Sequence, residues 1–197
     1  MYRINEIFYS LQGEGLWTGT PMVFVRFSGC NLKCPFCDTD HSAFREMSAD
    51  EIVAEVVQAG GTCGRVCVTG GEPSLQLDKV LVDALHGAGF QIHLETNGTR
   101  PLPEGVDWVT LSPKTDVKGL KGDGTVVLEK ADEVKLVYED GIDPKWAAFP
   151  ASWHFLQPCD TGDPAADRAI LAQTLDYILR NPRWRLSLQT HKLLKIR

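Results

Sequence analysis

The sequence has no long apolar run and no excess of positive charge. No apolar segment approaches the roughly 18 residues that a membrane-spanning helix needs, and residues 1–10 mix charged with apolar side chains, unlike a secretory signal. Lys and Arg number 20 against 26 Asp and Glu, a net charge of -6, whereas sequence-independent binding of nucleic acid needs a basic face. We therefore expect a cytoplasmic protein that binds neither membrane nor nucleic acid.

Internal repeats and low-complexity segments are also absent from the 197 residues. A chain of this length can bury a sizeable core. Its composition, 43% hydrophobic and 23% charged, is ordinary for a globular protein. We expect one domain over residues 1–197.

The six cysteines do not form the two CxxC-like pairs that a structural zinc site usually has. Three of them stand in one run, Cys30, Cys34 and Cys37. Thiolates suit iron or zinc, and three thiolates hold only three irons of a 4Fe-4S cluster, which leaves the fourth iron open to a ligand. We therefore interpret the run as a catalytic cluster site. The zinc alternative needs a fourth ligand, for which the candidates are Cys63, Cys67, Cys159 and His41.

Strand-like and helical patterns alternate in the first half of the chain. Apolar runs predict strands at residues 22–27, 65–69, 91–95, 108–112, 133–137 and 153–157. Helical spacing predicts helices at 48–60, 77–88 and 163–180, the first with a capping box of Ser48 and Glu51. The predicted core faces are Ile52, Val53, Val56 and Val57; Val80, Leu81, Ala84 and Leu85; and Ile170, Leu171, Leu175 and Ile178. Such alternation implies parallel βαβ units. We predict an α/β fold, a partial (βα)6-type barrel that is trimmed in its second half.

Chemistry in barrels of this kind gathers at the carboxyl ends of the strands. The motifs that fall there are Cys30, Gly70-Gly71-Glu72, Thr96-Asn97, Ser112-Pro113-Lys114 and Gln157-Pro158. Taken alone, Gly70-Gly71-Glu72-Pro73 is equally typical of a tight turn, and Thr96-Asn97 is equally a strand-end turn.

The cysteine run, with an aromatic residue before its last cysteine, resembles the cluster motif of the radical S-adenosylmethionine (SAM) enzymes. Gly70-Gly71-Glu72-Pro73 resembles their second hallmark. The resemblance implies a radical SAM barrel, with a 4Fe-4S cluster in a loop over residues 28–40 and SAM beside it. The glycines would let the backbone approach the methionine moiety, and Glu72 would accept hydrogen bonds from its ammonium group.

Six further motifs make the chain similar to the 7-carboxy-7-deazaguanine synthase family over nearly its whole length. They are Tyr9-Ser10-Leu11-Gln12-Gly13-Glu14-Gly15, Cys37-Asp38-Thr39, Glu95-Thr96-Asn97-Gly98, Leu111-Ser112-Pro113-Lys114, Leu156-Gln157-Pro158 and Gln189-Thr190-His191-Lys192. The resemblance implies a carbon–nitrogen lyase of queuosine biosynthesis, a tRNA modification pathway. Such an enzyme uses SAM, the cluster and Mg²⁺ to convert 6-carboxy-5,6,7,8-tetrahydropterin into 7-carboxy-7-deazaguanine and ammonia. A 5′-deoxyadenosyl radical would abstract hydrogen from C6 of the pterin.

The positions of these motifs indicate which residues the resemblance implies for binding SAM, the pterin and Mg²⁺. The expected SAM-binding residues are Phe36, Cys37, Asp38, Gly71, Glu72, Ser112, Pro113, Lys114 and Gln157. The expected pterin-binding residues are Leu11, Gln12, Gly13 and Glu14 in an N-terminal substrate loop (residues 8–15), with Arg26, Thr69, His191 and Arg197. Thr39 is the implied Mg²⁺ ligand, whereas the residues alone favour Asp38 and Asp40.

Arg26 interrupts an otherwise apolar strand. An unpaired buried charge is costly, so either a structural ion pair or an anionic ligand is required. We favour a bidentate grip on the substrate carboxylate, with the ion pair as the alternative.

The partners expected for such an enzyme are the small-molecule pterin and an electron donor such as flavodoxin or ferredoxin. A trimmed barrel with exposed edges makes a homodimer the expected assembly. Two other functions fit part of the sequence. A glycyl-radical-enzyme activating enzyme has no need of the loop at Gln12 to Glu14, and a non-catalytic iron–sulfur or zinc-binding module would need a fully ligated four-cysteine site.

Overall fold

The structure is a computed structural model that describes residues 1–40 and 42–197, so the candidate zinc ligand His41 lies outside the described residues. Within the described residues the strands form one nine-stranded sheet in the order β3-β1-β2-β4-β5-β6-β7-β8-β9. Their bounds are β1 (Tyr2–Leu11), β2 (Pro21–Phe27), β3 (Arg45–Met47), β4 (Arg65–Gly70), β5 (Gln91–Thr96), β6 (Trp108–Leu111), β7 (Ala131–Tyr138), β8 (Ala151–Pro158) and β9 (Arg185–Leu186).

The predicted parallel strands, β2 and β4 to β8, are neighbours in this sheet and pair in parallel. β9 pairs in parallel with β8, whereas β1 pairs antiparallel with both β2 and β3. Because β3 and β9 stand at the two ends of the strand order, the described sheet is open rather than closed. The prediction of a partial barrel is confirmed.

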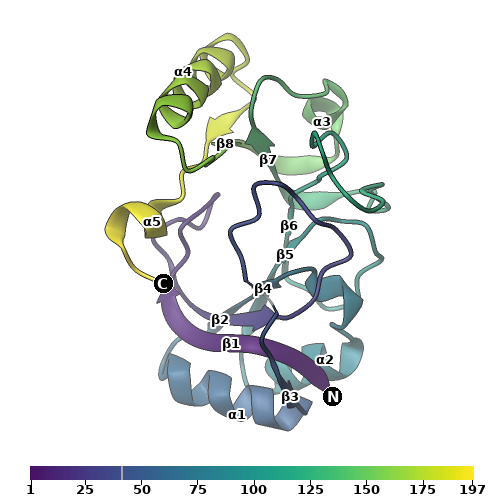
Figure 1. Ribbon diagram of the computed structural model, residues 1–197. Helices are drawn as coiled ribbons and strands as arrows, with labels where there is room; N and C mark the ends of the chain where they lie inside the picture. The colour runs from purple at the N-terminus through teal and green to yellow at the C-terminus, as the bar shows by residue number, and fades with distance from the viewer. Residues whose placement is uncertain (41) are drawn as a thin grey trace.

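Helices cover this sheet unevenly. They are α1 (Ala49–Gly60), α2 (Lys79–Gly87), α3 (Lys145–Ala148), α4 (Pro164–Arg180) and α5 (Thr190–Leu194), with a 3-10 turn η1 at Pro73–Leu75. Figure 1 shows α1 and α2 together at one end of the molecule and α4 at the other end, near β8. In the described residues no helix lies between β5 and β6 or between β6 and β7, which confirms the trimmed second half. None of the described helices is long and apolar enough to cross a membrane.

The capping box of α1 forms as predicted. The Ser48 hydroxyl oxygen accepts a hydrogen bond from Glu51 N at 3.2 Å, and Glu51 Oε2 accepts one from Ser48 N at 2.7 Å. These two bonds satisfy backbone donors that the first turn of a helix otherwise leaves unpaired. Residue 48 is therefore the cap, and the helix itself begins at Ala49.

Three predicted core residues are exposed instead: Val57 in α1, Val80 in α2 and Leu175 in α4. Val82 and Thr174 occupy buried positions in α2 and α4. Each helix turns only a limited stripe of its surface toward the sheet. Apolar residues on both sides of that stripe make its edge ambiguous in the sequence.

The sequence pattern does not predict β1. This strand runs to Leu11, so residues 8–11 of the expected substrate loop are extended backbone and only residues 12–15 form a loop. β1 contains an irregularity of pairing between Ile4 and Glu6, which interrupts the alternation of buried and exposed side chains that identifies a strand.

Side chains along the parallel strands alternate between the two sides of the sheet. Val68 and Leu94 pack into a core that includes side chains of α1 and α2. Val134 and Leu136 pack into a second core on the later strands. The side chain between them, Lys135, points the other way and lines a cavity. The same alternation places polar side chains of the neighbouring strands in that cavity.

Candidate active site

A cavity of about 630 Å³ opens at the carboxyl edge of the parallel strands. All but one of the residues that the sequence assigns to the cluster, SAM, Mg²⁺ or the pterin line it. The exception is Pro113, which lines a smaller hollow of about 50 Å³ beside Phe36. The motifs therefore share one cavity, as their strand-end positions predict, and Pro113 only adjoins it.

The cysteine run lies in the loop between β2 and β3. Cys37 is exposed, Cys30 and Cys34 are half-buried, and all three line the cavity. Cys37 N donates to Cys34 O at 3.1 Å, which closes a turn between the last two cysteines. The backbones of Lys33 and Lys121 exchange hydrogen bonds of 2.9 and 3.2 Å. The loop is thus fixed against the segment that follows β6.

The donor set of this loop fits an iron–sulfur cluster. Burial raises the pKa of the Cys30 and Cys34 thiols, and the nearby Lys114 ammonium partly offsets this. A bound metal would take the place of the thiol protons. In the described part of the chain no three His, Cys, Asp or Glu side chains converge on one metal ion, whereas the thiolates of a cluster each bind a different iron.

The four-cysteine zinc alternative is not formed among the described residues. The Cys63 thiol lies within hydrogen-bonding distance of Pro21 O, at 3.4 Å, and Arg65 O, at 3.5 Å, at the amino end of β4. Cys67 and Cys159 are buried and line the cavity apart from the cysteine loop, on β4 and directly after β8.

Gly70 and Gly71 pack the end of β4 against the loop that carries Cys30. Gly71 N donates to Phe27 O at 3.1 Å, and a Cβ on Gly71 would lie 2.1 Å from Gly29 O and 3.0 Å from Cys30 Cβ. Gly70 has a φ of +129°, and a Cβ there would meet Phe27 O at 2.1 Å. The glycines are therefore required by the protein's own packing, which sets the position of Cys30.

Glu72 joins the ends of β4 and β5. It is 1% exposed, its Oε1 accepts from Thr96 Oγ1 at 2.7 Å and Ser74 N at 3.0 Å, and its Oε2 accepts from Asn97 N at 2.7 Å. A carboxylate offers about four acceptor positions, so these three bonds still allow one from a ligand ammonium. Asn97 Nδ2 also donates to Asn31 Oδ1 at 3.2 Å, which extends the connection to the cluster loop.

A second group of residues in the cavity, which we call the polar ring, comprises Gln12, Glu14, Glu95 and Lys135. Lys135 Nζ donates to Glu14 Oε2 at 2.6 Å and to Glu95 Oε2 at 2.9 Å. Gln12 Nε2 donates to Glu95 Oε1 at 3.3 Å, and Gln12 Oε1 accepts from Glu14 N at 3.2 Å. The two acids are therefore joined twice.

The side chain of Glu14 is held by three donors. Besides Lys135, Gln157 Nε2 and Gln189 Nε2 donate to its Oε1 at 3.2 and 3.0 Å. Burial alone would raise the pKa of Glu14, but the Lys135 charge and these hydrogen bonds lower it to about 2. Glu14 is therefore ionised at neutral pH.

The sequence motifs did not assign three further members of the site, Glu95, Lys135 and Gln189, although each of these residues carries a signal in the sequence. Lys135 interrupts an apolar strand as Arg26 does, and Gln189 begins one of the family-like motifs. Glu95 likewise begins a family-like motif, but its bond to Lys135 follows only once the faces of the strands are known.

Glu133, two residues before Lys135 in β7, is a buried acid beside the polar ring. It is 1% exposed, and its Oε2 accepts from Leu16 N at 3.0 Å. Burial raises the pKa of Glu133 from 4.5 to about 7, with Lys135 opposing and Glu95 adding to the rise.

Replacing Glu133 by glutamine is expected to remove a pH dependence of stability. Between pH 4.5 and 7 the folded carboxyl stays protonated while the unfolded one ionises, so the free energy of unfolding falls as pH rises, by about 3 kcal/mol in all. Glu133→Gln keeps an acceptor for Leu16 N but does not titrate. Urea denaturation at pH 5 and pH 8 should show the variant gaining stability relative to wild type at pH 8. Parallel profiles for the two proteins would contradict the assignment.

Arg26 forms a structural ion pair with Glu6, the alternative to a grip on the substrate carboxylate. Its Nε lies 2.8 Å from Glu6 Oε1 on the neighbouring strand. Glu6 Oε2 pairs with Arg197, and Arg197 O accepts a hydrogen bond from Ser10 Oγ at 2.5 Å. Both arginines line the cavity, so the pair with Glu6 orients Arg26 without removing it from the site.

Residues 189–197, the C-terminal segment, connect the substrate loop to the cluster loop. Thr190 N and Oγ1 both donate to Gly13 O at 2.9 Å, and a Cβ on Gly13 would lie 2.1 Å from His191 Nδ1. Lys192 Nζ lies 2.7 Å from both Asp38 Oδ2 and Asp160 Oδ2. Burial lowers the pKa of His191, so its ring is neutral at pH 7.

The fold and the cysteine loop define a class of enzyme. Residues 24–118 match the model of the Radical SAM superfamily. The protein is therefore a radical SAM enzyme, with a 4Fe-4S cluster and SAM as cofactors.

Relatives that match over the whole chain identify the family within the radical SAM enzymes. The chain is 54% identical to the 7-carboxy-7-deazaguanine synthase of Bacteroides thetaiotaomicron over 197 residues, 100% of both chains. It is 42% identical to that of Bradyrhizobium diazoefficiens over 224 residues, 100% of this chain and 99% of the other. A crystal structure of QueE from Escherichia coli matches with a TM-score of 0.78 at 29% identity, over 95% of this chain and 93% of that one. The chain belongs to the 7-carboxy-7-deazaguanine synthase family, which sets aside the two alternative functions.

Proposed function

We propose that the chain converts 6-carboxy-5,6,7,8-tetrahydropterin into 7-carboxy-7-deazaguanine and ammonia, for queuosine or a related deazapurine. The observation that supports this function is that one cavity of about 630 Å³ contains both the cysteine run and the polar ring. The volume falls within the range of small-molecule sites. A cofactor and a pterin would therefore be held side by side in a shared space.

The cofactor part of the cavity lies beside the cysteine loop. When bound, the cluster and SAM supply a 5′-deoxyadenosyl radical, and the task of the protein is to hold the reactants and exclude water. Cys30, Cys34 and Cys37 would ligate the cluster. The residues proposed to contact SAM are Phe36, Asp38, Gly71, Glu72, Ser112, Lys114 and Gln157, with Pro113 supporting them from behind.

In the cofactor part of the cavity, the side chain of Lys114 is oriented by Ser112, the residue directly after β6. Its Nζ donates to Ser112 O and Ser112 Oγ, both at 2.6 Å. Burial lowers the pKa of Lys114. An ammonium fixed in this way beside Cys34 suits a site that gathers negative charge from thiolates and sulfides.

The pterin part of the cavity is the polar ring with its surroundings. Ionised Glu14 and the amide of Gln12 suit the N–H-rich edge of a pterin, and Arg26 suits its carboxylate. Neutral His191 lies against Gly13 on the same side. The remaining proposed contacts are Leu11, Thr69 and the terminal residue Arg197, all of which line the cavity.

The function is tested by an anaerobic assay. Protein reconstituted with iron and sulfide should consume the carboxypterin and release 7-carboxy-7-deazaguanine when given SAM, a reductant and Mg²⁺. Mass spectrometry of the products provides the measurement, with unreconstituted protein as the control. Cleavage of SAM without any turnover of the pterin would overturn the substrate assignment.

Arg26→Lys tests the grip on the substrate carboxylate. Lysine keeps the charge but loses the planar fork, so we expect KM for the pterin to rise about tenfold with little change in melting temperature. Glu6→Gln, which removes the partner of the ion pair, is the matched control for stability. An unchanged KM with a clear loss of stability in Arg26→Lys would favour a purely structural pair.

Thr39 is our proposed protein ligand for Mg²⁺. Thr39, Asp38 and Asp40 all line the cavity, but Asp38 Oδ2 is already engaged by Lys192 at 2.7 Å. Thr39→Val should therefore raise the Mg²⁺ concentration that gives half the maximal rate about tenfold. An unchanged Mg²⁺ titration curve would assign the metal elsewhere.

The proposal includes one domain over residues 1–197, a flavodoxin or ferredoxin as electron donor, and a homodimer. Exposed Leu179, Leu193 and Leu194 on α4 and α5 support an interface between copies, which analytical ultracentrifugation can test. The exposed Cys37 thiol requires a reducing compartment, which supports a cytoplasmic location.

A further inference from the structure

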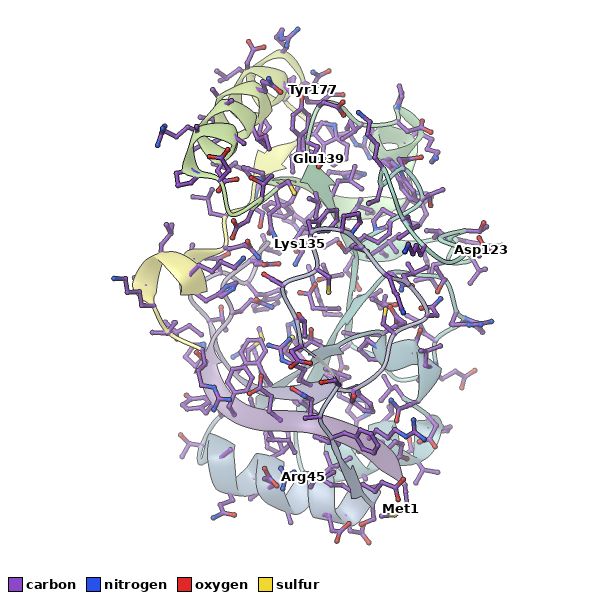
Figure 2. The ribbon with its side chains drawn as sticks, in the orientation of Figure 1. Met1, Arg45, Asp123, Lys135, Glu139 and Tyr177 are labelled. Atoms are coloured by element: carbon purple, nitrogen blue, oxygen red, sulfur yellow. The ribbon has the colours of Figure 1, made fainter. Side chains whose placement is uncertain are left out.

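A buried lysine stands at the centre of the polar ring. Lys135 lies in the middle of β7, is 5% exposed, and Figure 2 shows it near the middle of the molecule. Its strand neighbours Val134 and Leu136 pack into the core on the other side of the sheet. Burying an unpaired ammonium is strongly unfavourable, so the partners of Lys135 indicate what it does.

These partners come from separate parts of the chain. Glu14 lies in the loop after β1, Glu95 lies in β5, and Lys135 Nζ bonds to both, at 2.6 and 2.9 Å. Two of the three donors of the ammonium group are used in this way. Lys135 therefore fixes the distance between a loop and a strand, in addition to neutralising charge.

The polar ring carries a net charge of about -1, because one ammonium faces two carboxylates. Without Lys135 the two carboxylates would repel each other, and nothing would hold their acceptor oxygens at a fixed separation. The direction in which both acids point thus depends on the same lysine, whose charge also lowers the pKa of Glu14.

We propose that Lys135 is a positioning residue for the pterin, which holds Glu14 and Glu95 as a fixed pair of acceptors for the N–H edge of that substrate. The inference rests on the proposed function. It predicts that Lys135 affects binding of the pterin far more than that of SAM, because among the described residues its bonds go to Glu14 and Glu95 and not to the cysteine loop.

The test compares Lys135→Met with the double variant Lys135→Met/Glu95→Gln, which restores the net charge of the polar ring without restoring its geometry. Binding of the carboxypterin is measured by calorimetry on cluster-loaded protein with SAM and no reductant, so that no turnover occurs. We expect the double variant to keep its fold and its affinity for SAM. Its dissociation constant for the pterin should rise about tenfold to a hundredfold, and more SAM should be cleaved per product under turnover.

Lys79→Met is the control, since Lys79 is exposed and pairs with Asp83 on the surface of α2. It should bind both ligands as the wild type does. Wild-type pterin affinity in the double variant, with a defect in Lys135→Met alone, would show that Lys135 only balances charge. A parallel loss of SAM and pterin binding with a lower melting temperature would also overturn the proposal. Failure of the wild type to bind the pterin would instead overturn the proposed function.

Discussion

Cys34→Ala is expected to abolish the 4Fe-4S cluster and to lower product formation about a thousandfold or more. The run supplies three thiolates, and each binds a different iron, so the loss of one leaves an iron without a protein ligand. The other cysteines are not placed to replace it: Cys63 faces backbone oxygens at the amino end of β4, Cys67 is buried within that strand, and Cys159 is buried directly after β8. Iron and sulfide content, the absorbance of the cluster and product formation are measured after anaerobic reconstitution.

Cys63→Ala is the matched control for this substitution. It removes a thiol of similar burial, and it should reconstitute as much cluster as the wild type. An intact 4Fe-4S cluster in Cys34→Ala, or its loss in Cys63→Ala, would mean that the ligands have been assigned to the wrong cysteines.

Gly71→Ala is expected to lower the affinity for SAM about a hundredfold and to reduce the yield of reconstituted cluster. The new Cβ would lie 2.1 Å from Gly29 O and 3.0 Å from Cys30 Cβ. Since the closest atom belongs to the backbone, the loop must move, and it would carry Cys30 with it. Equilibrium binding of SAM to the cluster-loaded protein and the iron content of that protein are the measurements.

Gly87→Ala provides the comparison at a site without crowding. Apart from its chain neighbours and the backbone of its own helix, no heavy atom of the described residues lies within 4 Å of a Cβ built on Gly87, the last residue of α2. The substitution should leave SAM binding unchanged and raise stability by about 0.4–1 kcal/mol, because alanine restricts the unfolded chain. Equal effects of the two substitutions on SAM binding would show that the contact with Gly29 is not what matters at Gly71.

The parallel strands and the meeting of the motifs at one edge could be predicted from the sequence. Apolar runs of strand length and helical periods are local signals, and βαβ connectivity then places all carboxyl ends together. The capping box of Ser48 and Glu51 is equally local. These features depend on residues close together in the chain.

The polar ring could not be predicted in the same way. The members of the polar ring are far apart in sequence: Glu14 and Lys135 are separated by 121 residues. A local pattern of apolar and polar residues cannot predict that two such residues will meet. Motif position identified Gln12 and Glu14, but which donors fix them follows only from strand order and register. The role of Glu72 in joining β4 to β5 was hidden for the same reason.

Contacts of the C-terminal segment affect the order in which the two parts of the cavity can form during synthesis. Gln189 bonds to Glu14 across 175 residues of sequence, and Arg197 to Ser10 across 187. During synthesis the cysteine loop and its support from β4 and β5 emerge early, whereas these contacts must wait until residues 189–197 have left the ribosome. Closing such large loops is slow. A nascent chain can therefore present its cluster ligands well before it has a complete place for the pterin.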